Sequence, residues 1–221
     1  MIASAAHDIR SPLTAMKGFG YALSTRWDQM TDEHRSLMLQ GIVYDTDRMN
    51  LIVRQLVDAA RVVSGGLDLF PERVQVEELV RKVAEARARD PEHPAVEWKG
   101  GRVGAFLDPD RLQLVLEAFV EAEVWWASEG PVVVTAEVRG GRLFMDVFRA
   151  GTELTSDRAA TLFEPRPPGA GAGSKIGLFV ARGIAEAQGG SASVAVDDGL
   201  RLRLEIPAGE DAWGGSGGGA C

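Results

Sequence analysis

The sequence has almost no cysteine, no long apolar run and no excess of positive charge. Its single cysteine, Cys221, is the last residue, which excludes an internal disulfide and a cysteine-ligated metal site. No apolar stretch approaches the roughly 20 residues needed to cross a bilayer, and the N-terminus lacks the pattern of a secretory signal. The formal net charge of -8 argues against binding to nucleic acid or to an anionic membrane surface. We therefore expect a cytoplasmic protein with no nucleic-acid partner and no membrane insertion by this segment.

Two stretches near the N-terminus carry residues at alternating spacings of four and three, the heptad pattern of packed helices. The first helix is predicted over residues 1–25, with the seam Ile2, Ala6, Ile9, Leu13, Met16, Gly20 and Leu23. The second is predicted from Thr31 or Asp32 to Ser64, with the seam Met38, Ile42, Asp45, Met49, Ile52, Leu56, Ala59 and Val63. Asp45 interrupts this seam and needs a partner or water there. One hairpin alone leaves apolar surface exposed, so we expect a homodimer that closes a four-helix bundle.

From about Pro71 the hydrophobic period changes, and short strands alternate with helices. Strands are predicted at 74–76, 95–98, 103–107, 132–138, 143–148, 191–196 and 200–206, and helices at 77–88, 108–126, 156–163 and 176–188. Mostly antiparallel strands with helices indicate a two-layer α/β sandwich. The predicted fold class is therefore α+β. It comprises a helical hairpin at residues 1–66, a sandwich at 71–208 and a flexible tail at 209–221.

The run His7-Asp8-Ile9-Arg10-Ser11-Pro12-Leu13-Thr14 resembles the phospho-accepting box of sensor histidine kinases. The resemblance implies that His7 is the nucleophile that carries the phosphoryl group, and that Asp8 acts as general base or orients the ring. Ser11 lies one helical turn further on the same face, where family members with phosphatase activity usually carry Thr or Asn to position a water. Arg10 is placed to offset phosphate charge. The proline predicts a kink just after the site, and the ring is expected to point out of the bundle. The alternative reading is an ordinary surface histidine on a coiled-coil helix.

The segments after residue 70 follow the order of the catalytic and ATP-binding domain of the same family. The anchors of this resemblance, which extends over residues 1–207, are 108–113, 162–165, 177–178 and 181–190. In active members an asparagine on the long helix holds Mg²⁺, and a lysine three residues further meets phosphate. An aspartate accepts a hydrogen bond from the adenine amino group, and glycines let the backbone approach the phosphates. The resemblance thus implies a two-layer fold of the histidine kinase ATPase type.

Most residues that this resemblance implies for nucleotide binding are replaced. The degenerate nucleotide-site positions are Ala118 and Ala122 for asparagine, Trp125 for lysine, Arg149 for aspartate, Glu153 and Lys175 for glycine, and the retained Gly151 and Gly177. An alanine cannot bind a metal, and an arginine reverses the charge at the adenine position. We therefore expect no metal site, no bound cofactor and no use of ATP. Arg149 and Lys175 form either a basic patch for a partner or pairs with surface acids.

Two further pairs near these positions have alternative readings. Glu121 and Glu123 flank the lost asparagine positions and are either metal ligands or solvated helix residues. Trp125 and Trp126 either fill the vacant nucleotide cavity or close the sandwich core. The sequence alone leaves both alternatives open.

Three functions are compatible with an acceptor box beside a damaged nucleotide site. In the first, the protein is a dimeric phosphotransferase, or pseudo-histidine kinase, of a two-component system. His7 exchanges a phosphoryl group with an aspartate of a response-regulator receiver domain, which supplies its own Mg²⁺. In the second, retained Gly151, Gly177 and Phe163 belong to an active ATP-dependent kinase with an unorthodox site. In the third, the chain is a non-enzymatic dimeric scaffold and His7 is incidental. The first is our working hypothesis.

Overall fold

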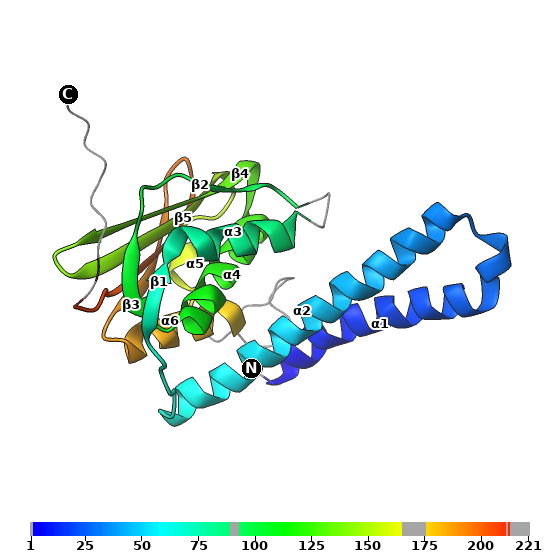
Figure 1. Ribbon diagram of the computed structural model, residues 1–221, viewed down its shortest axis with the longest axis horizontal. Helices are drawn as coiled ribbons and strands as arrows, with labels where there is room; N and C mark the ends of the chain where they lie inside the picture. Colours follow the sequence, from blue (N-terminus) through cyan, green and yellow to red (C-terminus); the bar gives the residue numbers. More distant parts are fainter. Residues whose placement is uncertain (1, 89–92, 165–175, 211, 213–221) are drawn as a thin grey trace.

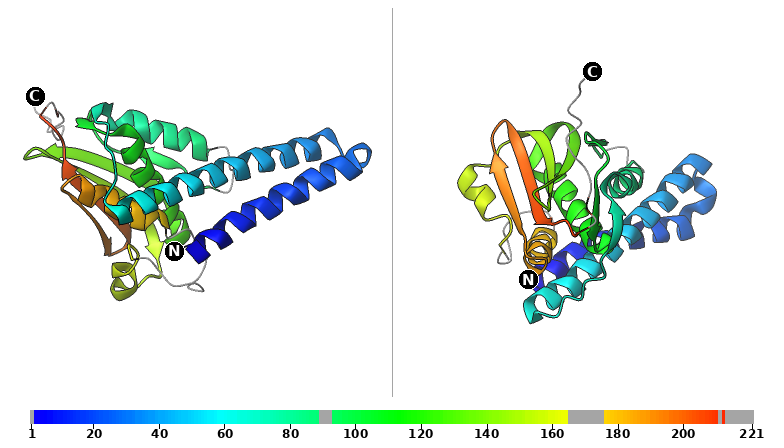
Figure 2. Two further views of the ribbon diagram at one scale, coloured as in Figure 1. Left: turned by 90° about the horizontal axis from the view of Figure 1, so that it is seen from below. Right: turned by 60° about the vertical axis from the view of Figure 1, so that its left-hand side comes forward.

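The computed structural model describes residues 2–88, 93–164, 176–210 and 212, and it has two parts (Figure 1). A long helical hairpin, residues 2–64, projects from an α/β domain, residues 72–207. Figure 2 shows that the tip of the hairpin extends away from this domain, whereas the other end lies against the domain's helices. The predicted α+β fold class is confirmed. Residues 165–175 and most of the predicted flexible tail lie outside the described residues.

The hairpin has the helix boundaries that the sequence predicts. Its elements are α1 (Ile2–Arg26), the 3-10 helix η1 (Trp27–Gln29) and α2 (Asp32–Ser64). The Thr31 hydroxyl caps α2 by accepting a hydrogen bond from the His34 N–H at 3.2 Å. Gly65 ends α2 in the left-handed conformation, with a φ of 69°, which glycine adopts without strain. Both boundaries were predictable because capping residues act locally.

The contact between α1 and α2 departs from the predicted seam at two positions. Leu23 and Ile52 are buried as expected, but Leu13 and Val63 are 51% and 65% exposed. In α1 the neighbouring Pro12 is buried instead of Leu13, so the buried stripe is rotated by one residue there. Val63 lies in the last turn of α2, where α1 no longer covers it. The prediction that these two residues pack in the seam is therefore wrong for the single chain.

Polar side chains mark the middle of the hairpin. Asp45 is buried, and desolvation raises its pKa, while the charge of Arg48 lowers it in part. This nearby cation partly meets the predicted need of Asp45 for a partner. The Thr46 hydroxyl donates to Met16 Sδ at 3.2 Å and thereby defines which residues of the two helices lie side by side.

The α/β domain contains one sheet of five strands and one of two. The spatial orders are β2-β4-β5-β7-β6 and β1-β3, and only β2 and β4 are parallel neighbours among the described strands. The strands are β1 (Glu72–Gln75), β2 (Val96–Trp98), β3 (Gly104–Leu107), β4 (Ala127–Arg139), β5 (Arg142–Thr152), β6 (Ser191–Val196) and β7 (Gly199–Pro207). The mainly antiparallel sheet agrees with the prediction. The hairpin of β4 and β5 is longer at both ends than alternation alone indicated.

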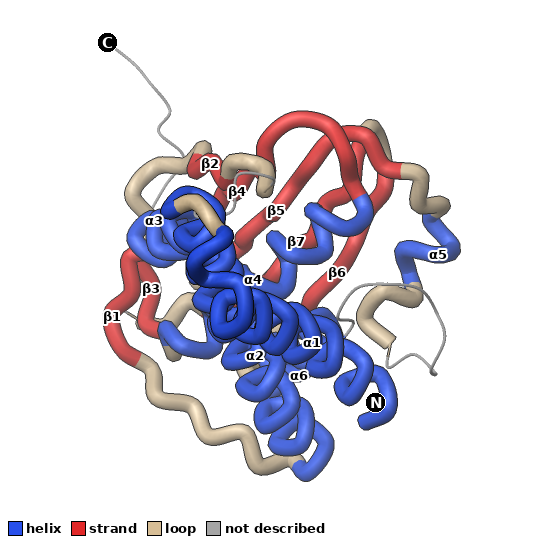
Figure 3. The backbone as a smooth tube through the Cα atoms, turned by 90° about the vertical axis from the view of Figure 1, so that its right-hand side faces the viewer, coloured by secondary structure: helices blue, strands red, loops and turns tan. Residues whose placement is uncertain are grey.

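The helices of this domain are α3 (Val76–Arg87), α4 (Pro109–Trp126), α5 (Ser156–Ala160) and α6 (Ile176–Ala187). Figure 3 shows α3, α4 and α6 between the hairpin and the five-stranded sheet. Helix α5 ends at Ala160, short of the predicted Phe163. The chain tightens there into turns of i to i+3 hydrogen bonds, and Leu162 and Phe163 are buried.

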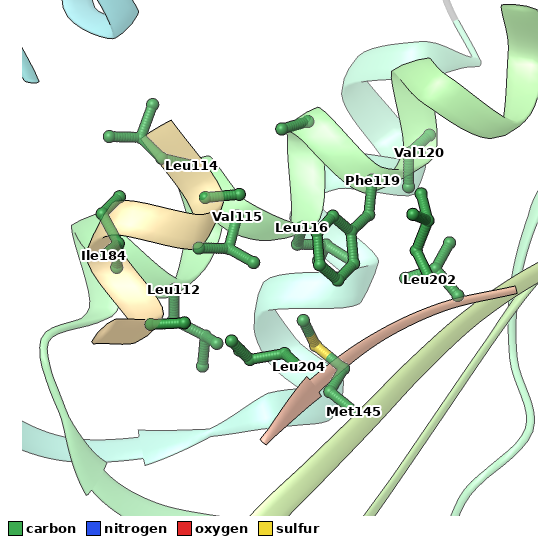
Figure 4. Packing of buried hydrophobic residues seen from close by; sticks show 14 of the residues in the cluster. Leu112, Leu114, Val115, Leu116, Phe119, Val120, Met145, Ile184, Leu202 and Leu204 are labelled. Carbon is green, nitrogen blue, oxygen red and sulfur yellow. The ribbon is translucent and has the colours of Figure 1, made fainter. Parts of the chain in front are cut away.

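The main core lies between α4 and the five-stranded sheet. In Figure 4, Leu116 and Phe119 of α4 lie close to Met145 of β5 and to Leu202 and Leu204 of β7, and all five are almost fully buried. Burying a large apolar side chain contributes about 1.5–3 kcal/mol, so this layer holds α4 firmly on the sheet. Helix α4 carries three of the predicted nucleotide-site positions, at residues 118, 122 and 125.

Candidate functional site

The predicted acceptor box lies in the first half of α1. His7 and Asp8 belong to this helix, and their side chains lie outside the described part of the structure, so the predicted orientation of the ring stays a prediction. Arg10 and Ser11 are exposed to solvent. The Thr14 hydroxyl donates to the Arg10 carbonyl oxygen at 2.8 Å, and the helix continues through the proline of the box. The box is therefore presented on a regular helical surface.

The antiparallel register of the hairpin sets the level of His7 along α2. His7 precedes Met16 by nine residues, and Gln55 follows Thr46, the partner of Met16, by nine residues. Because both helices rise about 1.5 Å per residue, His7 and Gln55 lie at the same level of the hairpin. Gln55 is only 1% exposed, since α2 packs against the α/β domain here. The acceptor box thus lies level with the junction between the two parts.

Two predicted nucleotide-site residues, Gly177 and Ala118, lie next to each other at this junction, and Gly177 meets α2. A Cβ added at Gly177 would lie 2.9 Å from Gln55 Nε2 and 3.1 Å from Ala118 Cβ. Ala118 is itself buried. The structure therefore brings together a predicted phosphate-side glycine and a predicted metal-ligand position, and it packs a side chain of the hairpin against the glycine.

Arg149, at the position of the adenine-binding aspartate, holds the start of β4. Its Nη1 donates to the Ala127 carbonyl oxygen at 2.7 Å, and its Nε donates to the Gly130 carbonyl oxygen at 3.0 Å. Burial lowers the pKa of Arg149, and the Glu123 carboxylate offsets this in part. A guanidinium group has no acceptor, so Arg149 cannot replace an aspartate toward an adenine amino group.

Glu123 is fully buried beside Arg149. Its carboxylate oxygens make no well-formed hydrogen bond to another described residue, although the Arg149 backbone N–H faces them. Burial raises the pKa of Glu123 to about 9, because the charges of Arg149 and Arg201 offset desolvation only in part. Glu121, in contrast, pairs with Arg87 at 4.0 Å. The two glutamates share no site, and no group of three potential His, Cys, Asp or Glu ligands occurs among the described residues.

The other predicted nucleotide-site positions add no polar cluster in the described part of the chain. Ala122 is buried, and Glu153 is exposed. Gly151 keeps a φ of 72°, and a Cβ there would lie 2.5 Å from Glu129 Cγ. Lys175 lies outside the described residues. Of the retained glycines, Gly151 therefore meets the side chain of a neighbouring strand and Gly177 meets the hairpin.

The two tryptophans at the end of α4 have different surroundings. Trp125 is 43% exposed and lines a cleft of about 760 Å³ between α2, α3 and α4. It is too exposed to close the core, so that prediction is wrong for it, and the alternative that it fills a nucleotide cavity stays a prediction. Trp126 packs against the domain core, and its carbonyl oxygen accepts a hydrogen bond from the Thr152 hydroxyl. Of the two tryptophans, only Trp126 packs in the sandwich core as predicted.

Similarity to known proteins covers both parts of the chain. The profile of the His Kinase A (phospho-acceptor) domain matches residues 1–65, which contain the predicted acceptor box. Sensor histidine kinase ZraS of Escherichia coli (strain K12) is 24% identical over 204 residues, covering 90% of this chain and 43% of that protein. Sensor protein KdpD of Mycobacterium tuberculosis (strain ATCC 25618 / H37Rv) is 26% identical over 223 residues, covering 96% and 26%. The chain is therefore similar to sensor histidine kinases over both of its parts. It spans less than half the length of these curated relatives.

Solved histidine kinase structures share the fold over nearly the whole chain. Histidine kinase AdeS of Acinetobacter baumannii has a TM-score of 0.66 at 19% identity, covering 92% of this chain and 98% of that chain. Full-length ShkA, solved in complex with AMPPNP, has a TM-score of 0.65 at 24% identity, covering 97% and 46%. The predicted likeness to the histidine kinase ATPase domain is confirmed as a likeness of fold. None of the described helices combines the length and apolarity needed to span a bilayer.

Sequence reasoning missed the residues that join the hairpin to the α/β domain. Arg111 Nη1 lies 2.5 Å from Asp58 Oδ1, with side-chain exposures of 11% and 4%. Asp108 Oδ1 accepts a hydrogen bond from the Arg111 N–H at 3.0 Å, and its Oδ2 accepts one from the Phe70 N–H at 2.9 Å. The capping role of Asp108 was readable from the sequence, because Asp-Pro is a local helix-start signal. No local signal paired Asp58 with Arg111.

Proposed function

We propose that this protein carries a phosphoryl group on His7, exchanges it with a response-regulator aspartate, and does not use ATP itself. The match of the phospho-acceptor domain to residues 1–65 supports the first part. The observation that carries the last part is Arg149, whose guanidinium group is bound to the carbonyl oxygens of Ala127 and Gly130 at the position where adenine needs an acceptor.

The residues present do not fit a magnesium nucleotide. Mg²⁺ prefers hard oxygen ligands, and neither Ala118 nor Ala122 offers one. Glu123 lies next to the second alanine in sequence, but it is fully buried, and burial raises its pKa so that it is neutral at pH 7. Gln55 packs where Gly177 would otherwise face an open site. The proposal therefore includes no step through ATP.

Exchange of a phosphoryl group with a receiver domain requires of this chain mainly a nucleophile and a nearby positive charge. A ring nitrogen of His7 attacks the phosphorus of an aspartyl phosphate; the P–N bond forms as the P–O bond breaks, and the aspartate leaves as a carboxylate. Asp8 orients the ring and accepts the proton that the phosphorylated imidazole releases. Arg10 offsets phosphoryl charge, and Ser11 is exposed where its hydroxyl can orient a water for hydrolysis. The Mg²⁺ belongs to the receiver domain.

We further propose that the protein acts as a homodimer. Helix α2 presents a second apolar stripe that the contact with α1 leaves open, formed by Leu39, Val43, Val53 and Val57, each about half exposed. Leu39 and Val53 are two heptads apart, as are Val43 and Val57, so the four residues lie on one face. Leu13 of α1 is exposed as well. A second hairpin would cover these residues and close a four-helix bundle.

The decisive test is transfer of a labelled phosphoryl group to the full chain from a panel of receiver domains phosphorylated with labelled acetyl phosphate. We expect acid-labile, base-stable label on the parent protein and none on His7→Gln. His34→Gln, which changes an exposed histidine outside the box, should retain the label. Labelled ATP with Mg²⁺ should give no label. Absence of transfer from every receiver, or label retained in His7→Gln, would contradict the proposal.

A second candidate function is an autokinase with an unorthodox nucleotide site. Two observations favour it: Gly151 retains its positive φ, and the fold resembles that of ShkA, which was solved with AMPPNP. Calorimetric titration of the full chain with ATP and Mg²⁺ separates the two candidates. A saturable binding heat together with ATP-derived label on His7 would establish the autokinase and refute the ATP-independent part of the proposal.

A further inference from the structure

Helix α2 occupies the face of α4 and α6 that the resemblance to a kinase ATP domain assigns to phosphate and metal. Gly177 stands at a phosphate-side glycine position, and Ala118 stands at a metal-ligand position. The side chain of Gln55 packs against Gly177, close enough that a Cβ there would lie 2.9 Å from its amide nitrogen, and Ala118 borders the same glycine. The absence of a side chain at Gly177 therefore provides the space that Gln55 takes.

A second small residue brings α2 and α6 together further along the same contact. A Cβ added at Gly183 would overlap the side chain of Val62. Ala59 of α2 is almost completely buried and belongs to the core cluster of the α/β domain. Small residues at a helix crossing let the two helices approach closely, and their replacement by larger residues forces the helices apart. The contact is therefore packed like a domain interior.

A buried ion pair fixes the same contact. Asp58 of α2 and Arg111 of α4 are both withdrawn from solvent and lie 2.5 Å apart. Loss of one partner would leave the other as a buried, uncompensated charge. Asp108, one turn earlier in α4, accepts a hydrogen bond from the Phe70 N–H and so ties the connecting segment to the same helix end. The hairpin and the segment that follows it are thus both held at the N-terminus of α4.

From these contacts we infer that the former phosphate side of α4 and α6 has become a socket for α2, which keeps the α/β domain docked on the hairpin. A domain that delivers nucleotide to its own histidine needs this face open and needs freedom to move. Here Gln55 fills the face, and the Asp58–Arg111 pair and Gly183 hold the helices together. Since Gln55 is level with His7, the docked domain lies at the level of the predicted acceptor along the hairpin. This inference concerns domain geometry and goes beyond the proposed phosphoryl transfer.

The inference is tested by measuring the distance between two spin labels with pulsed electron paramagnetic resonance. The labels replace Asp28 at the hairpin tip and Asp197 at the turn between β6 and β7, both exposed, in the full chain carrying Cys221→Ser. Labelled chains are diluted with excess unlabelled chain, so that only distances within one chain are read. We expect one narrow distance distribution that saturating ATP and Mg²⁺ leave unchanged.

Variants of the socket supply the matched comparison. Gly183→Leu places a side chain into Val62 and should replace the narrow peak by a broad distribution, whereas Gly18→Leu, where a Cβ meets nothing within 4 Å, should not. Asp58→Asn should also broaden the distribution, whereas Glu85→Gln, which breaks an exposed ion pair, should not. Circular dichroism of each variant checks that it is folded. If Gly183→Leu does not fold, the comparison of Asp58→Asn with Glu85→Gln decides the test.

Three outcomes would overturn the inference. The first is a broad or two-peaked distribution in the parent protein. The second is a shift on addition of ATP and Mg²⁺, which would show that nucleotide competes with α2. The third is an unchanged narrow peak in folded Gly183→Leu and in Asp58→Asn. None of these measurements depends on label at His7, so failure of the docking inference and failure of the transfer proposal are read separately.

Discussion

Glu123 allows a sharp prediction because one substitution of nearly equal shape removes a buried titrating group. Burial raises its pKa to about 9 in the folded protein from an ordinary 4.5. Below pH 4.5 both the folded and the unfolded state are protonated, and folding carries no penalty from this group. As the pH rises toward 9, the unfolded state releases its proton while the folded state retains it, so stability falls. Since pH 7 lies about 2.5 pH units above 4.5 and each unit is worth about 1.4 kcal/mol, the penalty at pH 7 is about 3 kcal/mol.

Glu123→Gln cannot release a proton and should escape this penalty. We expect the free energy of unfolding to rise by about 3 kcal/mol at pH 7 and by only about 1 kcal/mol at pH 5. Urea unfolding of the parent and the variant at both pH values measures this difference. Glu85→Gln, which changes a side chain that is 70% exposed, serves as the control and should show little effect at either pH. An unchanged or lower stability of Glu123→Gln at pH 7 would refute the reasoning, because it would mean that Glu123 is ionised and paired with Arg149.

Two further substitutions test the contacts that surround the site. Asp108→Ala removes both the cap of α4 and the acceptor for the Phe70 N–H, and should lower the free energy of unfolding by about 2 kcal/mol in urea unfolding. Asp108→Asn keeps one of the two acceptor oxygens and replaces the other by an amide nitrogen that cannot accept, so its stability should lie between those of the parent and of Asp108→Ala. Arg149→Asp restores the residue expected in an ATP site, but it removes two hydrogen bonds to the start of β4 and adds an acid beside Glu123. It should lower the free energy of unfolding by about 2–4 kcal/mol, and calorimetry should detect no ATP binding; recovered binding would show that Arg149 alone closes the site.

Much of the fold could be predicted because its signals are local. Thr31 and Gly65 bound α2 through their own capping interactions, and Asp108 begins α4 in the same way. The alternation along β5 predicted which of its residues are buried, since successive side chains in a strand point to opposite faces. Helix α5 was predicted too long, because burial of Leu162 and Phe163 depends on the rest of the domain. Local patterns therefore placed the elements and left some of their ends uncertain.

The site was only partly predictable, since its main interactions join residues that are far apart in the sequence. The replacements at Ala118 and Arg149 were visible as departures from a family pattern, but the hydrogen bonds of Arg149 to the start of β4 were not. Trp125 was misplaced, because helical spacing does not reveal which face of α4 the hairpin will leave open. The pairing of Asp58 with Arg111 depends on how two parts of the chain dock, and hydrophobic periodicity carries no information on that.

The residues at the predicted nucleotide-site positions are physically coupled to the rest of the molecule. An arginine at position 149 would be a partly buried cation without hydrogen-bond acceptors if it did not bind the carbonyl oxygens of Ala127 and Gly130. Alanine at position 118 would leave a void beside Gly177 if Gln55 did not pack there. Restoring one nucleotide-binding side chain would therefore disturb a contact that now stabilises the fold or the docked hairpin. Exchange of a phosphoryl group with a receiver domain requires only the hairpin and the metal ion of the receiver. Such coupling therefore does not lower the proposed activity.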